Sequence, residues 1–211
     1  MRFFKLTLLA AGFLSLASCS KYPPLSSRLL EDLAILTQYD VNTNFGQYKT
    51  FSMVDSISYI SDKSTKKILD AQAKAVLTRI AQDLTSRGYQ EVAKSTNPDL
   101  GINVSAIEVT NVTAYYPGWY WGYPGYYPPD WWGYPGNSYY YPYYPTYYTS
   151  YSSGTLSIEM VNFKKINPKG QIPVVWNAFI RGLLTGTHTT VDITNSIDQS
   201  FAQTPVLKTS L

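Results

Sequence analysis

The chain has almost no thiol or imidazole chemistry. Cys19 is the only cysteine and His188 the only histidine among 211 residues. A lone cysteine cannot form an intrachain disulfide, and one cysteine with one histidine cannot supply the ligands of a Cys/His zinc site. We therefore expect no cysteine nucleophile, no metal and no organic cofactor, and we expect an apolar core to stabilise the fold.

The chain also has no apolar run long enough to span a membrane permanently. Arg2 and Lys5 precede the apolar residues 6–16, and the small residues Ala17 and Ser18 follow. A transmembrane helix needs about 20 apolar residues. The charge, the length and the small residues at the end instead predict a signal peptide.

The signal peptide ends in Leu16-Ala17-Ser18-Cys19, which resembles the lipobox of bacterial lipoproteins. In that motif the cysteine receives a diacylglycerol and the signal peptidase then cleaves before it. We expect cleavage between Ser18 and Cys19, lipid on Cys19, and residues 19–31 as a lipidated tether. The alternative is an ordinary signal peptide with a coincidental cysteine, but the only cysteine of the chain stands at the cleavage point.

The lipid predicts where the protein resides. Two or three acyl chains hold a protein on a membrane almost irreversibly, so we expect the membrane as a partner. Ser20 stands where an inner-membrane retention signal would have aspartate, which favours the outer membrane of a bacterial envelope. Loss of residues 1–18 leaves 15 basic and 14 acidic residues, and this near-neutral balance gives no reason to expect a nucleic-acid partner.

Residues 115–151 form a tract of unusual composition. Its 37 residues include 15 Tyr, 4 Trp, 7 Pro and 5 Gly, and Asp130 is its only charge. Pro and Gly interrupt helices and strands, so we expect a long low-complexity insertion. Tyr and Trp rings suit stacking on glycans, a protein interface or lipid headgroups, while a disordered insertion is the alternative. The candidate binding side chains are Trp119, Trp121, Trp131, Trp132, Tyr140 and Tyr144.

The residues before this tract have the periodicity of regular elements. Residues 33–39 and 48–54 alternate as strands. Residues 64–87 have apolar side chains at helical spacing, which predicts a helix with Lys66 and Lys67 in its first turn. Residues 100–106 alternate as a strand, and the later change of phase suggests a bulge.

The residues after the tract predict a hairpin and a second helix. Residues 156–160 and 174–180 alternate and are joined by a turn at 167–170, which favours antiparallel pairing. Thr189 is expected to cap the last helix. The order of elements predicts the α+β class, with an antiparallel or mixed sheet of about five strands covered on one face by two helices. We expect a single domain over residues 32–211, interrupted by residues 115–151.

Several short motifs, taken in order, resemble a known family. They are Tyr39-Asp40, Phe45, Tyr48-Lys49-Thr50-Phe51, Arg87-Gly88-Tyr89, Asn97-Pro98-Asp99-Leu100, Gly154-Thr155-Leu156, Val175-Trp176 and the closing residues Ile197 to Phe201. Together they look like the bacterial lipoprotein family filed as domain of unknown function 4136. The resemblance runs from about Leu33 to Pro205. It implies a lipoprotein signal and, in many members, an aromatic insertion, but it implies no activity and no catalytic residue.

An enzymatic function is the less favoured hypothesis. His188 lies in a loop without a second histidine, and the carboxylates Asp40, Asp55, Asp99 and Glu159 are scattered through turns and strands. Glycoside cleavage needs two carboxylates that face one cleft. We favour a non-enzymatic envelope lipoprotein that binds or scaffolds an envelope glycan or another envelope protein. The alternative is a hydrolase acting on envelope glycans.

Overall fold

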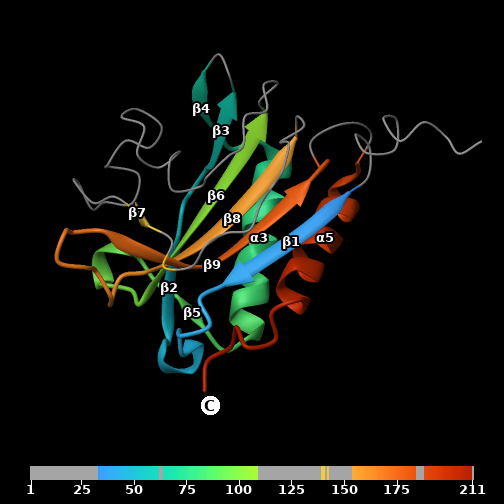
Figure 1. Cartoon of the computed structure of the whole chain (residues 1–211). Coiled ribbons are helices and arrows are strands. Elements are labelled where there is room, and N and C mark those ends of the chain that lie inside the picture. The colour runs from blue at the N-terminus through green and yellow to red at the C-terminus, as the bar shows by residue number, and fades with distance from the viewer. Residues whose placement is uncertain are drawn as a thin grey trace, which may run out of the picture. The chain divides into compact units, whose positions relative to one another are not determined.

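The computed structural model describes residues 33–61, 64–108, 139–140, 142, 154–183 and 188–210, which form a mixed β-sheet and two α-helices (Figure 1). The strands are β1 (Ala34–Tyr39), β2 (Thr50–Met53), β3 (Ile57–Ser61), β4 (Thr65–Ile68), β5 (Gln90–Glu91), β6 (Leu100–Glu108), β7 (Tyr139–Tyr140), β8 (Thr155–Asn162) and β9 (Ile172–Arg181). The helices are α3 (Ala71–Ser86) and α5 (Thr190–Ala202), and the short 3-10 turns are η2 (Phe45–Gln47) and η3 (Lys94–Thr96). None of these helices is long and apolar enough to cross a membrane.

The strands follow the order β1-β9-β8-β6-β2-β5. The pairs β1/β9, β9/β8 and β8/β6 are antiparallel, which confirms the predicted hairpin. Both β2 and β3 pair with β6 in parallel, along its first and second halves, and β4 pairs with β3. The α+β class and the mixed sheet are thus confirmed. The sheet has nine strands where about five were predicted, because several strands are too short to show a period in the sequence.

The long helix begins later than predicted. Residues 65–68 are the edge strand β4, and Asp70 caps α3 by accepting a hydrogen bond at Oδ1 from the N–H of Ala73 (2.8 Å). Leu69 matches the helical spacing but is 50% exposed and lies outside the helix. Lys66 and Lys67 therefore lie on a strand and not in a first helical turn, since the Asp70 cap fixes the start of α3.

The predicted bulge after residue 106 is not found in β6. Its register against β8 runs without interruption from Leu100 to Ile107. Ile107 is buried on the face away from the helices, so the change of phase reflects a strand with apolar residues on both faces. The irregularity lies instead in the pairing of β8 with β9, where Met160 pairs with Trp176 and Val161 with Val174, so that Val175 is the extra residue.

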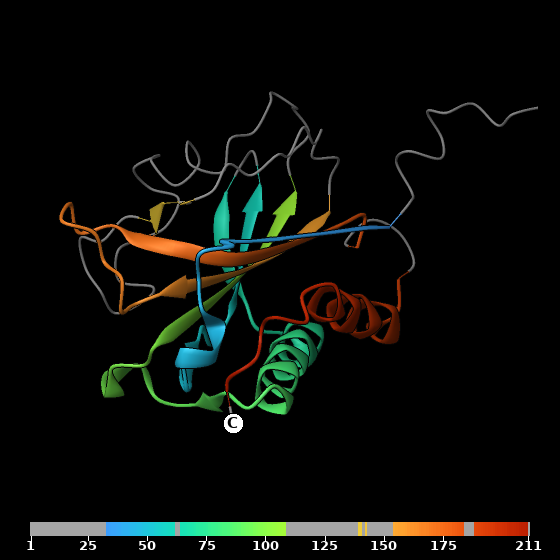
Figure 2. The same cartoon turned by 60° about the horizontal axis from the view of Figure 1, so that its bottom comes forward.

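The apolar core lies between the sheet and the helices. Both helices lie on the same side of the sheet in Figure 2. Trp176 of β9 is fully buried there, stacks on Phe201 with ring centroids 5.0 Å apart, and donates from Nε1 to Thr204 Oγ1 (3.0 Å). The predicted cap of α5 is present as a capping box between Thr189 and Asp192. The main apolar core therefore lies on the helix side of the sheet, as the α+β class implies.

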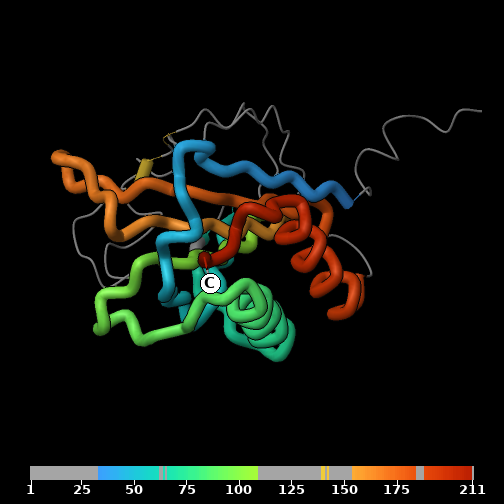
Figure 3. The backbone as a smooth tube through the Cα atoms, turned by 90° about the horizontal axis from the view of Figure 1, so that it is seen from below, coloured from blue at the N-terminus to red at the C-terminus, as the bar shows by residue number. Residues whose placement is uncertain are grey.

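The residues after α5 fasten the lower end of the domain. Figure 3 shows this segment returning between η2 and the end of α3. The N–H of Thr209 donates to the carbonyl of Arg87 (3.1 Å), and the N–H of Ser210 donates to the carbonyl of Gly46 (3.0 Å). These bonds tie the C-terminal residues to the turn η2 and to the end of α3.

Candidate functional site

The face of the sheet opposite the helices carries polar side chains in register. Side chains alternate along a strand, so Glu159 of β8 points away from the buried Ile158 and Met160. The register places Asn103 of β6 on one side of Glu159 and Asn177 of β9 on the other. A carboxylate thus lies between two amides on adjacent strands.

Hydroxyl groups line the neighbouring positions of the same face. Ser105 pairs with Ser157 of β8 and with Ser58 of β3, and Ser157 pairs with Phe179 of β9. We call this surface the polar face. Its members are Gln38, Ser58, Asn103, Ser105, Thr155, Ser157, Glu159 and Asn177.

The central members of the polar face are withdrawn from solvent. Glu159 is 3% exposed, Asn103 2% and Asn177 0%. Asn103 Nδ2 donates to Glu159 Oε2 at 3.3 Å. Removing a carboxylate from water costs free energy unless the carboxylate is hydrogen-bonded. The Glu159 carboxylate therefore needs polar groups around it on this face.

Two hydroxyl groups show where such a partner is needed. The Oγ of Ser58 and the Oγ1 of Thr155 are buried and have no hydrogen-bond partner within the described ranges. A buried polar atom without a partner costs about 1–3 kcal/mol. The two side chains lie on β3 and β8, on either side of β6. Hydroxyl groups that need a hydrogen-bond partner therefore occur on both sides of the polar face.

An apolar cluster continues the polar face toward the hairpin of β8 and β9. Val161, Ile172 and Val174 are buried there, with Tyr139 and Phe163 packed against them. Gly101 lies beneath Phe163, since a Cβ at residue 101 would lie 2.5 Å from the aromatic ring. The absence of a side chain at residue 101 lets the ring approach the backbone of β6 closely.

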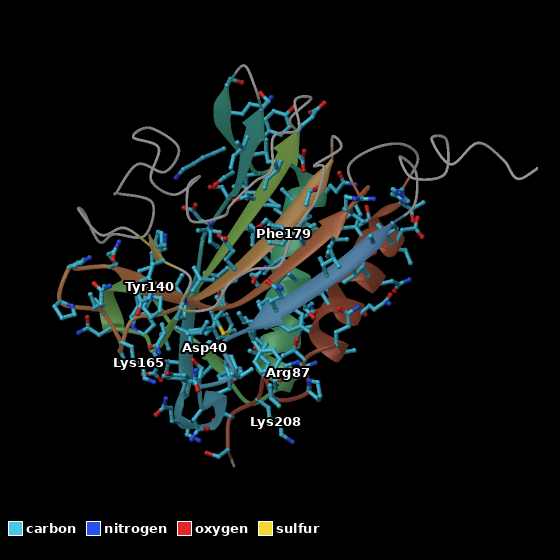
Figure 4. All side chains as sticks on the ribbon, in the orientation of Figure 1. Asp40, Arg87, Tyr140, Lys165, Phe179 and Lys208 are labelled. Atoms are coloured by element: carbon cyan, nitrogen blue, oxygen red, sulfur yellow. The ribbon has the colours of Figure 1, made fainter. Side chains whose placement is uncertain are left out.

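Tyr140 is the predicted binding residue that the structure places. It belongs to β7, which pairs in parallel with residues 172–173 of β9, and its side chain is half-buried. Figure 4 labels it near the hairpin, with Phe179 in the middle of the sheet. The other predicted residues lie outside the described residues: Ser18, Cys19, Trp119, Trp121, Trp131, Trp132 and Tyr144.

Asp40 and Asp99 have structural roles, and Asp55 accepts from the hydroxyl of the neighbouring Ser56 (2.9 Å). Asp40 accepts from the N–H of Asn42 (3.0 Å) and from the hydroxyl of Thr43 (2.7 Å) in the turn after β1. Asp99 accepts from the N–H groups of Lys49 (2.7 Å) and Thr50 (3.0 Å), and so joins β2 to β6. Neither carboxylate has both oxygens available for chemistry.

His188, the histidine considered above, lies beside the N-terminal cap of α5. His188 precedes α5 near Asp192, whose pKa is lowered by the Thr189 cap and, to a smaller extent, by His188. Among the residues that the structure describes, no three His, Cys, Asp or Glu side chains gather to hold a metal ion.

A small polar cleft lies at the lower end of the sheet. It has a volume of about 250 Å³ and is lined by Gln47, Tyr48, Asp99, Lys164 and Lys165. Burial raises the pKa of Tyr48. Because Asp99 is already bound to Lys164 and to the backbone of β2, the cleft is mainly the entrance to a structural ion pair.

Sequence reasoning did not find the polar face. The signal was present, since Asn103, Ser105, Ser157 and Glu159 occupy alternate positions in two strands. Such a pattern normally marks a solvent-facing side of a sheet. Only the register and the burial show that the side chains meet and are covered.

The chain is similar to known proteins in sequence and in structure. The sequence model of the family described as "Domain of unknown function (DUF4136)" matches residues 35–206. The crystal structure of a DUF4136 family protein from Bacteroides thetaiotaomicron VPI-5482 is 37% identical, with a TM-score of 0.69, and the alignment covers 83% of this chain and 97% of that one. The PelC dodecamer from Paraburkholderia phytofirmans is 12% identical, with a TM-score of 0.42, over 85% and 100% of the two chains. The search of curated proteins gives no match.

Proposed function

The chain belongs to the DUF4136 family, and we propose that it is a lipid-anchored envelope lipoprotein that binds or scaffolds another envelope component without catalysing a reaction. The observation that carries this proposal is the polar face. It is an array of amides, hydroxyls and one carboxylate in register on adjacent strands of the sheet. An enzyme of the hydrolase type needs a concave site with converging ionisable groups, whereas a binding module needs a surface.

The surroundings of Glu159 argue against a glycan hydrolase. Glycosidases place two carboxyl groups about 5–10 Å apart across the scissile bond. Within the polar face as described, Glu159 is the one carboxylate, and its cross-strand neighbours Asn103 and Asn177 are amides. An amide cannot act as general acid or nucleophile in that mechanism.

Lipid anchoring has a direct test. We expect the wild-type protein expressed in a bacterium to enter the detergent-rich phase on phase partitioning, and the Cys19→Ala variant to stay in the aqueous phase. Intact mass spectrometry should show the acyl chains on Cys19 of the wild type only. Detergent partitioning and unchanged cleavage of Cys19→Ala would refute the anchor.

The Tyr and Trp content of residues 115–151 is a second, separate support for binding, and it is tested through aromatic stacking, which depends little on salt. We expect the unlipidated protein to sediment with purified peptidoglycan or with outer-membrane vesicles, equally at low and high salt. A variant in which Trp119, Trp121, Trp131 and Trp132 are replaced by serine should remain in the supernatant. Equal sedimentation of the two proteins, or none of either, would refute a binding role of these rings for both surfaces.

A further inference from the structure

Among the residues that the structure describes, six large apolar side chains are exposed, and three of them lie where the two helices and the first strand begin. Leu69 is 50% exposed between β4 and α3, and Val191 is 64% exposed in the first turn of α5. Leu33 is 38% exposed just before β1. The remaining three are Val41, Ile166 and Val206.

A small pocket connects the starts of the two helices. It has a volume of about 40 Å³ and a mostly apolar lining. Ile68 and Asp70, the chain neighbours of Leu69, both line it. Ile193, two positions after Val191, lines it from α5. The exposed side chains at the two helix starts therefore lie around one opening in the core.

The start of β1 lies at the same end. Ala34 pairs with Arg181 at the end of β9, and Leu183, two residues further along, lines the pocket. Leu33 precedes this pair by one residue. In Figure 1, β1 and both helices run downward from this end of the domain. We call Leu33, Leu69 and Val191 the end patch.

The chain that leads to the proposed lipid attaches at the end patch. Residues 19–32 connect Cys19 to Leu33. An extended chain spans about 3.3 Å per residue, so these residues reach at most about 46 Å. A tether of that reach keeps the domain near a bilayer without fixing which side faces it. The tether also supplies an effective concentration of about millimolar, so a contact of low affinity is enough to fix the orientation.

The chemistry around the end patch suits a lipid surface. Apolar side chains that enter the boundary between headgroups and acyl chains leave water, which is favourable. Asp70 and Asp192, the acidic residues at the helix starts, are engaged as helix caps. The exposed Lys66 and Lys67 of β4 add positive charge, which anionic headgroups attract. The end patch is thus an apolar surface with positive charge beside it.

We propose that the end patch lies in the headgroup layer of the membrane that holds the lipid, so that the starts of β1, α3 and α5 face the bilayer. This inference rests on the lipid anchor proposed above. The opposite end of the domain, with the turn after β1, then points away from the membrane. The contact depends on the tether, so it does not hold the unlipidated protein on vesicles.

A fluorescent label on the end patch tests the contact. In the mature lipoprotein the diacylglycerol blocks the sulfur of Cys19, so an introduced cysteine is the free thiol. Leu69→Cys and Val191→Cys place a nitrobenzoxadiazole label on the end patch. Val41→Cys places it on an exposed valine beyond the other end of β1. Each lipidated protein is inserted into phosphatidylethanolamine and phosphatidylglycerol vesicles, with or without a lipid that carries a nitroxide quencher at its headgroup.

We expect the nitroxide lipid to quench the labels at 69 and 191 at least about twofold more than the label at 41, because interfacial side chains lie within about 5–10 Å of the headgroups. Equal quenching at all three positions, or none, in protein whose mass shows lipid on Cys19 would overturn the inference and leave the anchor standing. Absence of lipid on Cys19 would overturn both. A blue shift at 191 without lipid quenching would show that protein covers the end patch, and would also overturn the inference.

Two triple variants test whether the apolar side chains make the contact. Both carry the label on Gln72→Cys, an exposed residue that lines the same pocket. One has serine at all three positions of the end patch, and the matched control has serine at Val41, Ile166 and Val206. Exposed substitutions of this kind should leave thermal unfolding of both variants nearly unchanged. We expect quenching at 72 to fall at least about twofold in the end-patch variant and to persist in the control. An equal fall in both, or in neither, would overturn the inference.

Discussion

At the scale of single residues, two aspartates respond to the fold in opposite ways. Burial, with the nearby Asp198 carboxylate, raises the pKa of Asp83 to about 6, and Arg79 offsets this only in part. Burial would also raise the pKa of Asp99, but the N–H groups of Lys49 and Thr50, with Lys164, hold it below its usual value. The two side chains therefore contribute to stability with opposite dependence on pH.

The raised pKa of Asp83 means that its ionised form is disfavoured in the folded state. Its contribution to stability is present below about pH 4 and is lost as the pH rises toward 6. We predict that Asp83→Asn increases the free energy of unfolding at pH 7 by about 1 kcal/mol and changes it little at pH 4. Urea unfolding at the two pH values measures this, and a loss of stability at pH 7 would contradict the assignment.

The lowered pKa of Asp99 gives the reverse expectation. A carboxylate whose folded pKa is depressed stabilises above its unfolded pKa, and the contribution disappears as the pH falls through the folded value. We predict that Asp99→Asn lowers the free energy of unfolding at pH 7 by about 1–3 kcal/mol, because it weakens the bonds to β2. The deficit should shrink steadily as the same titration is carried toward pH 3. A deficit that does not change with pH would mean that the charge of Asp99 has no part in it.

At the scale of elements, the start of α3 can be tested by mutation. Asp70→Ala removes the side chain that accepts from the N–H of Ala73, and we predict a loss of about 1 kcal/mol in the free energy of unfolding. Ser64→Ala is the matched control at the start that the sequence suggested. It should change stability by less than about 0.5 kcal/mol. A larger loss of stability in Ser64→Ala than in Asp70→Ala would instead support a helix that begins near Ser64.

The sequence predicted an element correctly when the element was long and had its apolar residues on one face. The hairpin of β8 and β9 and the cap of α5 were found because each has a long apolar period or a distinct capping pair. The short strand β4 was not found, because Thr65 to Ile68 also fits the helical spacing of the residues that follow. The pairing of Asn103, Glu159 and Asn177 was not found because cross-strand register depends on contacts distant in sequence.

At the scale of the whole molecule, the sheet protects its edges differently on its two sides. On β1, Gln203 donates from Nε2 to the carbonyl of Ile35 (3.4 Å) and accepts from the hydroxyl of Thr37 (3.0 Å). On the other side, the described part of β4 pairs only with β3 and carries the exposed Lys66 and Lys67. Lysines on an edge strand discourage pairing with another chain.

This arrangement predicts an effect on self-association. Replacing Lys66 and Lys67 together by threonine leaves a neutral edge with high β propensity, so we expect concentration-dependent dimers or larger species. Sedimentation velocity at several concentrations measures them. The control is Lys165→Thr with Lys169→Thr, which removes the same charge from the connection between β8 and β9. Equal association of both variants would point to net charge and not to the strand edge.

The common end of four strands has a mechanical consequence. Ala34 pairs with Arg181, and Glu108 ends β6 beside the start of β8. The residues that lead toward the N-terminus and those that lead toward the tract 115–151 are therefore attached at the same end of the sheet. If lipid holds one and a ligand holds the other, tension passes crosswise through β1, β9, β8 and β6. Hydrogen bonds between antiparallel strands lie along such a pull, so they would break one pair at a time. β1 would then peel from β9 at low force, lengthening the link to the membrane while the helices and the core stay folded.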